Sequence, residues 1–195
     1  MASRFALVYA TDPSAPQIAN AEARPNIDYR VEAAEHCGLA DASADLVSVA
    51  QPLHWFDHAR FYAEVQRVLK PRGVLAAWTY ADCRVEPAID AVKDRLYVEL
   101  TGPYWPPERA HVDSGYRSLP FPFEEIASPP FAMSMQWTVG QFLAYLRSWS
   151  ATQHYLRDKG EDPVALVEAD LRAAWGNADA PREVRWDFHL RCGRC

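Results

Sequence analysis

The chain has 195 residues and a formal net charge of −6, and 49% of its residues are apolar, which suits a globular domain with a sizeable core. An acidic chain without a basic run is poorly suited to a nucleic-acid backbone. No apolar run is long enough to predict a transmembrane segment or a signal peptide, so we expect a cytoplasmic protein with neither nucleic-acid nor membrane partners.

The first fifty residues alternate between strand and helix patterns. The continuous apolar run Phe5–Thr11 predicts a parallel strand that is buried on both faces. A short helix is expected over residues 18–23, and alternating apolar residues predict a strand over Ile27–Val31. Leu46–Ala50 is a second apolar run, again typical of a buried strand.

The next fifty residues repeat this alternation. Asp57 is a plausible N-cap for a helix whose apolar side chains share one face. Pro71-Arg72-Gly73 predicts a turn, and Val74–Trp78 predicts another buried strand. A further amphipathic helix is expected over residues 89–100. Strands that alternate with helices in this way favour an α/β fold with a parallel sheet.

The character of the chain changes after Leu100. Residues 102–130 are rich in proline and aromatic residues and predict an irregular loop. Alternation over Phe131–Trp137 predicts a strand, and Thr138 with Gln141 predicts a capping box at the start of the next helix. Another helix is expected over residues 162–175, and alternation over Val184–Leu190 predicts a final strand that is antiparallel.

Asp12 is the most informative candidate for a binding residue. It follows the first strand, and ligands of open α/β sheets bind at the carboxyl ends of the strands. A carboxylate there can accept hydrogen bonds from both hydroxyls of a ribose, which would serve NAD and S-adenosylmethionine equally well. The alternative is that Asp12 only caps the helix that follows.

Several segments together carry a family resemblance. The segments are ATDPS, YRVEAAE, DLVSVAQPLHWFD, RVLKPRGVLAAW, YLRSWSAT and VRWDFHLRCGR. In this order and spacing they resemble class I S-adenosylmethionine-dependent methyltransferases of the methyltransferase type 11 group, close to the trans-aconitate-methyltransferase-like proteins. The resemblance implies a Rossmann-like sheet that is mostly parallel with an antiparallel last strand. It also implies S-adenosylmethionine as the cofactor and a small molecule as the acceptor.

One part of the family pattern is absent from the sequence. The family's first strand, its G-x-G-x-G loop and the helix after that loop have no counterpart before the strand of Asp12. The missing strand would lie at the centre of the sheet, between the strand of Asp12 and the strand that ends at Ala50. We therefore expect a sheet that is incomplete at its amino-terminal end, either in a truncated enzyme or in a degenerate relative.

The resemblance also assigns roles to residues of the cofactor region. Asp12 would hold the ribose, and Ala34 and Glu35 would contact the adenine ring. Gln51 would lie at the end of the fourth strand of the family fold, where the cofactor methyl group is presented. His54 is the candidate general base, and Trp55 beside it is a candidate substrate contact.

The carboxyl-terminal half is expected to recognise the acceptor. Trp105 and Trp149 would belong to a helical lid that closes over a small substrate, and Arg147 could pair with a substrate carboxylate. The expected division is a partial cofactor-binding core over residues 1–101, a lid and substrate region over 102–183, and a final strand and tail over 184–195. Cys192 and Cys195 form a lone C-x-x-C, which we expect to lie in an exposed tail without a metal.

The resemblance implies methyl transfer from S-adenosylmethionine to a small molecule, with a carboxylate or hydroxyl oxygen favoured as the acceptor. The [DN]-P-P-[FYW] loop common in methyltransferases that act on nitrogen is replaced by residues 50–56, AQPLHWF. Two alternatives stay open: a non-catalytic methyltransferase remnant or interaction protein, and an NAD-dependent oxidoreductase.

Overall fold

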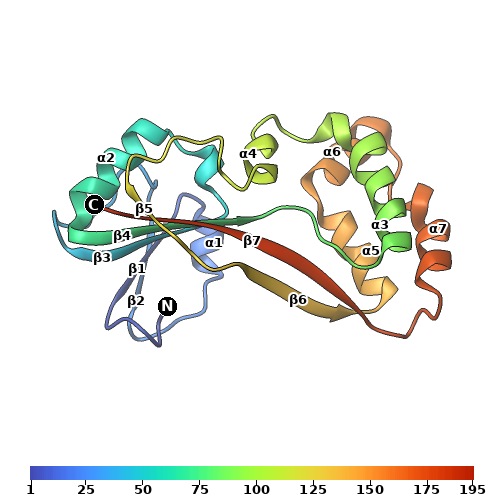
Figure 1. Cartoon of the computed structure of the whole chain (residues 1–195), viewed down its shortest axis with the longest axis horizontal. Helices are drawn as coiled ribbons and strands as arrows, with labels where there is room; N and C mark the ends of the chain where they lie inside the picture. Colours follow the sequence, from blue (N-terminus) through green and yellow to red (C-terminus); the bar gives the residue numbers. More distant parts are fainter. The chain divides into compact units, whose positions relative to one another are not determined.

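The computed structural model describes residues 1–195, which divide into two units (Figure 1). Unit 1 consists of Met1–Trp78, Leu119–Ser128 and Arg191–Cys195. Unit 2 consists of Thr79–Ser118 and Pro129–Leu190. No helix in either unit combines the length and apolar character needed to cross a membrane.

Two parallel strands open unit 1. β1 (Val8–Asp12) pairs with β2 (Ile27–Val31), and these two strands form a sheet of their own. The strand predictions are confirmed, although β1 begins three residues later than Phe5. The intervening helix is α1 (Ala15–Ala19), which begins three residues before the expected range of 18–23. The reason is the proline in its first turn, since proline is favoured at the start of a helix.

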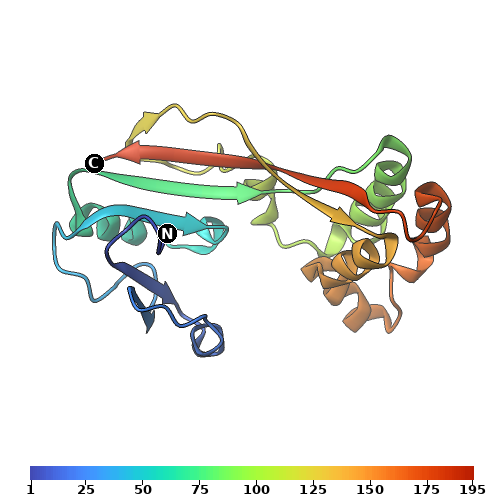
Figure 2. The ribbon, with the colours of Figure 1, turned by 90° about the horizontal axis from the view of Figure 1, so that it is seen from below.

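The second strand pair of unit 1 is β3 (Ala44–Ala50) with β4 (Leu69–Tyr80), again parallel (Figure 2). A short 3₁₀ turn, η1 (Leu53–Trp55), and the helix α2 (His58–Val68) connect them. Asp57 caps α2 as predicted, since its side chain accepts a hydrogen bond from the backbone N–H of Arg60 at 3.2 Å. The expected turn at residues 71–73 lies within β4.

The predicted burial of the first strands is wrong. β1 has no fully buried residue, and in β3 only Val49 is buried, at 5% exposure. The reason is the sheet arrangement, because β1 pairs with β2 alone and β3 pairs with β4 alone. Each of these two strands therefore has one edge without a strand partner, and its apolar side chains are half-exposed.

The region expected to be an irregular loop contains three short elements. They are the 3₁₀ turn η3 (Gly102–Tyr104), the helix α4 (Arg109–Asp113) and the strand β5 (Glu124–Ile126). β5 pairs antiparallel with the final strand, with Ile126 opposite Cys192. This long-range pairing is what makes the segment a strand, and local sequence patterns do not reveal it.

The helices of unit 2 largely follow the predicted positions. Helices lie at the predicted positions in α3 (Pro87–Asp94) with its π-helical continuation η2 (Arg95–Leu100), in α5 (Val139–Ser148) and in α7 (Ala165–Trp175). The separate helix α6 (Ser150–Lys159) was not predicted. The capping box of Thr138 and Gln141 is present at the start of α5, as predicted. Trp149 lies between α5 and α6 rather than within a helix.

The last strand organises a mixed sheet of five strands. β7 (Arg182–Arg194) pairs antiparallel with β5 and with β6 (Phe131–Trp137), which confirms the antiparallel final strand. The strand order is β3-β4-β7-β5, with β6 also paired to β7. Parallel strands with an antiparallel carboxyl-terminal strand are the arrangement that the sequence predicted.

Candidate functional site

Asp12 is the final residue of β1, at the carboxyl end of the parallel pair β1 and β2. Its Oδ1 atom accepts a hydrogen bond from the backbone N–H of Ser14 at 2.7 Å, and the residue is half-buried. This bond fixes the orientation of the carboxylate. The carboxylate retains further lone pairs that can accept hydrogen bonds from a ligand with two neighbouring hydroxyls.

The turn that follows β2 lies beside Asp12, because Asp12 is opposite Val31 in the strand register. Glu32 begins this turn, and its two carboxylate oxygens each lie 2.9 Å from the hydroxyl of Tyr9. The backbone N–H of Gly38 also donates to Glu32, at 3.0 Å. These contacts close the turn, so Glu32 has a clear structural role.

Glu35 connects this turn to the start of α2. Its Oε1 atom accepts a hydrogen bond from the backbone N–H of Asp57 at 3.0 Å. Ala34 is half-buried in the same turn. The structure therefore brings the residues after β2 close to the residues that precede α2, although they are far apart in the sequence.

The segment after β3 has an unusual backbone. Gln51 has a φ of 77°, in the left-handed region that residues other than glycine rarely adopt, and its N–H donates to the carbonyl of Trp78 at 3.0 Å. The rings of His54 and Trp55 lie 4.8 Å apart, and Trp55 is 58% exposed. A left-handed conformation such as that of Gln51 is often found at functional sites, where surrounding contacts hold it in place.

A feature that sequence analysis missed anchors the segment between β2 and β3. Arg67 of α2 makes a bidentate pair with Glu64, with contacts of 2.8 and 2.7 Å. The same guanidinium donates to the carbonyls of Cys37 and Leu39 and to the carboxylate of Asp41. One arginine thus holds a whole loop against α2, and no local pattern signals it because the partners are distant in sequence.

Glu64 is 8% exposed and also accepts a hydrogen bond from the backbone N–H of Cys37 at 2.7 Å. The hydrogen bonds from Arg67 lower the pKa of Glu64 to about 2. The ionised form is therefore the form that stabilises the fold.

We expect Glu64→Gln to lower the free energy of unfolding by about 1.5–3 kcal/mol at neutral pH, the usual range for hydrogen bonds to a charged group. Since the pKa is lowered in the folded state, this stabilisation is complete above the unfolded value of about 4.3 and is lost as the pH falls toward about 2. The difference between wild type and variant should therefore shrink below about pH 4 in urea unfolding measurements. Glu99→Gln, at an exposed glutamate, is the control, and a difference that does not vary with pH would contradict this interpretation.

Three of the predicted acceptor residues, Trp105, Arg147 and Trp149, lie in unit 2. Trp149 is 8% exposed, and its ring lies 5.7 Å from that of Trp105 and 5.5 Å from that of Tyr97. The guanidinium of Arg147 contacts Asp162 and Glu168, both at 2.7 Å. These three residues therefore have internal packing or ion-pair contacts, and their role in acceptor binding stays a prediction.

The carboxyl-terminal cysteines differ from expectation in one respect. Cys192 belongs to β7, opposite Ile126, rather than to an exposed tail, and it is half-buried. Cys195 is exposed, as predicted, and both cysteines are free thiols. Pairing with β5 explains why the strand extends this far along the chain.

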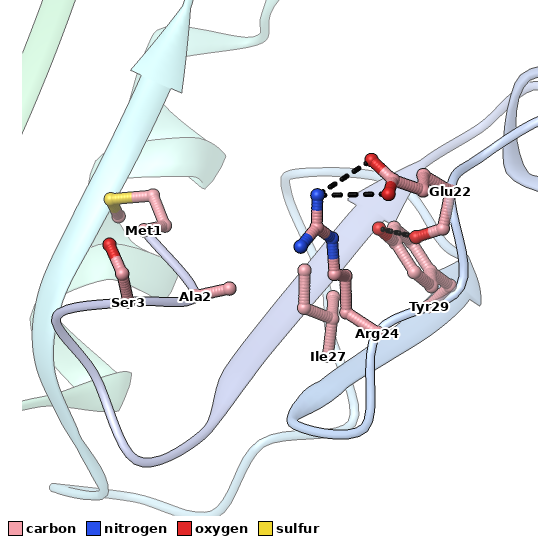
Figure 3. A pocket seen from close by; sticks show the side chains of 7 residues that line it. All are labelled: Met1, Ala2, Ser3, Glu22, Arg24, Ile27 and Tyr29. Carbon is pink, nitrogen blue, oxygen red and sulfur yellow. Dashed lines mark hydrogen bonds and ion pairs between the residues drawn. The ribbon is translucent and has the colours of Figure 1, made fainter.

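A surface hollow in unit 1 has a volume of about 360 Å³. Figure 3 shows the side chains that line it. Arg24 lies in it and pairs with Glu22 at 2.9 Å, so the charges in the hollow compensate each other. The hollow lies at the amino end of β2, where Ile27 begins the strand, whereas Asp12 lies at the carboxyl end of β1. It is therefore a different region from the candidate site. Its lining residues are Met1, Ala2, Ser3, Glu22, Arg24, Ile27 and Tyr29.

Comparisons with known proteins identify the family. A family model described as a methyltransferase domain matches residues 1–77. A candidate methyltransferase of Dictyostelium discoideum is 32% identical over 187 residues, which cover 94% of this chain and 71% of that protein. The solved structure of a candidate type II methyltransferase from Anaeromyxobacter dehalogenans is 48% identical, with a TM-score of 0.93 over 99% of this chain and 82% of that chain.

A more distant structure shows the fold alone. A candidate methyltransferase from an antibiotic biosynthesis pathway of Anabaena variabilis is 18% identical, with a TM-score of 0.52. The identity and coverage of the two nearer relatives decide the family. The chain belongs to the class I S-adenosylmethionine-dependent methyltransferases and has their Rossmann-like fold, as the sequence predicted.

Proposed function

We propose that this chain binds S-adenosylmethionine at the carboxyl end of β1 and transfers its methyl group to a small-molecule acceptor. The observation that carries the proposal is the carboxylate of Asp12, which the N–H of Ser14 orients at 2.7 Å at the end of a parallel strand. The family membership of the chain supports S-adenosylmethionine over NAD as the nucleotide that this carboxylate holds.

The residues around Asp12 fit the different parts of such a cofactor. Asp12 would accept hydrogen bonds from the ribose hydroxyls, and the turn of Ala34 and Glu35 would line the adenine. Gln51, whose unusual backbone turns the chain at the end of β3, would contact the methionine part. When bound, the cofactor supplies an electrophilic methyl group, so the protein mainly has to align the acceptor and exclude water.

We favour an oxygen acceptor. The imidazole of His54 would accept the proton of an acceptor hydroxyl, whereas a carboxylate acceptor would need no base. Trp55, which is 58% exposed, offers an apolar surface beside it for a small substrate. Residues 50–56 lack the Asp/Asn-Pro-Pro-aromatic pattern that is common in methyltransferases acting on nitrogen.

The arrangement of the sheets also supports a second candidate function, that of a non-catalytic member of the family. β1 and β3 belong to separate sheets, and each has one unpaired edge. We propose that a further strand between them completes the cofactor site in an active enzyme. Without such a strand, the 195 residues would bind S-adenosylmethionine weakly and behave as a non-catalytic member of the family.

We expect Asp12→Ala to weaken cofactor binding about ten- to a hundred-fold, because loss of charge-assisted hydrogen bonds costs about 1.5–3 kcal/mol. The measurement is a calorimetric titration with S-adenosylhomocysteine, carried to millimolar ligand so that weak binding is captured. Asp12→Glu should restore little, because the longer side chain moves the carboxylate.

Two further variants separate ligand binding from local folding. Asp12→Asn can still accept the hydrogen bond from Ser14, but an NH2 donor replaces its second carboxylate oxygen, so its loss of affinity would reflect the missing charge and the missing acceptor rather than a disturbed turn. Asp28→Ala removes an exposed carboxylate from β2, which pairs with Arg30, and should leave affinity unchanged. Equal affinity in wild type and Asp12→Ala would exclude Asp12 from the site.

A further inference from the structure

The outer edge of β6 is unusual for an exposed strand. β6 has seven residues, and its only strand partner is β7. Its sequence, FAMSMQW, contains no charged residue and no proline, which are the usual devices that prevent exposed strands from pairing with other chains. Phe131 and Met135 are 50% and 47% exposed, so apolar side chains accompany this edge.

The sequence of β6 is nearly symmetrical about Ser134. Reading outward from Ser134, each direction meets a methionine, then a small or uncharged residue, then an aromatic residue. An antiparallel pair of two β6 strands centred on Ser134 would place Phe131 of one copy opposite Trp137 of the other. It would likewise place Met133 opposite Met135, and cross-strand pairs of this apolar kind stabilise antiparallel sheets.

The opposite face of β6 is equally compatible with self-pairing. Ala132, Ser134 and Gln136 occupy that face, so only small or uncharged side chains would meet across the junction. The residue opposite Ser134 on the neighbouring strand β7 is Arg185, which is charged. Two copies of Arg185 would be three strand spacings apart, about 14 Å, which is beyond the screening length of about 8 Å at physiological ionic strength.

We propose that this chain forms a two-fold symmetric homodimer in which the β6 edges of two copies pair antiparallel around Ser134. We favour a second copy over another partner because β6 matches itself: when two β6 strands pair antiparallel around Ser134, compatible side chains meet on both faces of the sheet. A two-fold axis requires one patch to match itself, and the near-palindrome of β6 meets this requirement.

Cysteine cross-linking tests the register directly. In a Cys195→Ser background, which removes the exposed native thiol, Ser134→Cys should form a disulfide-linked dimer on mild oxidation. Directly opposed residues in antiparallel strands have Cα atoms about 4.5–5.5 Å apart, within the range for a disulfide. Gln136→Cys alone should not cross-link, because Ala132 would face it, whereas Ala132→Cys combined with Gln136→Cys should.

Sedimentation equilibrium of the unmodified chain provides a second test. The wild type should reach the mass of a dimer at high concentration, and Ser134→Lys, which would bring two positive charges together at the axis, should remain monomeric. Gln66→Lys adds the same charge at an exposed position of α2 and should still dimerise. Circular dichroism and thermal melting check that Ser134→Lys folds.

A wild type that stays monomeric at all concentrations would overturn the proposal. A dimer that survives Ser134→Lys would overturn it as well, because the interface would then lie elsewhere. If Ser134→Lys fails to fold, the cross-linking pattern decides alone, and equal cross-linking of the Ser134 and Gln136 single variants would exclude the proposed register.

Discussion

Lys93→Ala is expected to lower the free energy of unfolding by about 3–5 kcal/mol, the cost of removing one partner from a buried ion pair. Lys93 is fully buried in unit 2, and its Nζ contacts the carboxylate of Asp82 and, at 2.8 Å, that of Asp94. The variant would leave Asp82, which is 16% exposed, with its charge largely uncompensated. The backbone N–H of Cys83 would still donate to it at 2.8 Å.

The ionisation of Lys93 follows from the balance of two effects. Burial lowers its pKa, but attraction to Asp82 and the hydrogen bonds from the ammonium group outweigh burial, so the pKa is raised. A raised pKa in the folded state means that the stabilisation is complete below the unfolded value of about 10.4 and is lost as the pH rises through the folded value. The effect of Lys93→Ala should therefore be full at neutral pH.

Urea unfolding of three variants would check this expectation. Lys70→Ala removes an exposed lysine that pairs with Asp45 at 2.8 Å, and it should cost less than about 1 kcal/mol. Lys93→Met keeps the volume of the side chain but not its charge, so it separates lost packing from the uncompensated carboxylate. Similar losses for Lys93→Ala and Lys70→Ala would show that the buried pair does not stabilise the fold.

Local sequence signals predicted much of this fold. Asp57 at the start of α2 and the capping box at Thr138 act within a few residues, so the sequence alone is sufficient to recognise them. The alternation of β7 was equally informative, because Val184 and Trp186 are buried while their neighbours are exposed. These predictions succeeded because neighbouring residues determine the structure.

Predictions that depended on distant partners were less successful. An apolar run such as that of β1 indicates a strand but does not say how many strands flank it, so its burial was overestimated. The loop anchor of Arg67 joins α2 to residues that lie 26 to 30 positions earlier in the chain. Lys93 reads as an ordinary helix-surface residue, and only the tertiary structure shows its burial.

The same difference between local signals and distant contacts applies to the candidate site. The end of a strand predicted the position of Asp12, and the structure places Asp12 at the carboxyl end of β1. The hydrogen bond between Glu35 and the N–H of Asp57 brings two of the predicted segments together, which no spacing in the sequence indicates. The ion pairs of Arg147 with Asp162 and Glu168 were also outside what local patterns can show.

The last expected result concerns the open edges of β1 and β3. We expect that adding an apolar strand, a G-x-G-x-G turn and a helix before the present sequence will raise the melting temperature and strengthen binding of S-adenosylhomocysteine. A change from millimolar to micromolar affinity would correspond to about 4 kcal/mol. The glycine turn would contribute because it lets the backbone approach the ligand closely.

The structural reason lies in the exposed apolar surface of unit 1. Leu7 beside β1 is 67% exposed, and Val31 of β2 is 53% exposed. A strand between β1 and β3 would pair with both edges, and each of its five or six apolar residues would contribute about 1.5–3 kcal/mol before entropy costs are subtracted. Because a domain has a net stability of only about 5–15 kcal/mol, we expect such a strand to add a large fraction to the stability of unit 1.

Two control extensions identify which part of the added segment is responsible. Replacing its three glycines by alanine should keep the gain in stability but lose the gain in affinity, because the strand would remain and the close backbone approach would not. Placing a proline at the centre of its strand should abolish both gains, since proline removes a hydrogen-bond donor from the sheet. The 195-residue chain provides the reference. If that chain itself melts sharply and binds S-adenosylhomocysteine with micromolar affinity, no further strand is needed, and the site around Asp12 is already sufficient for cofactor binding.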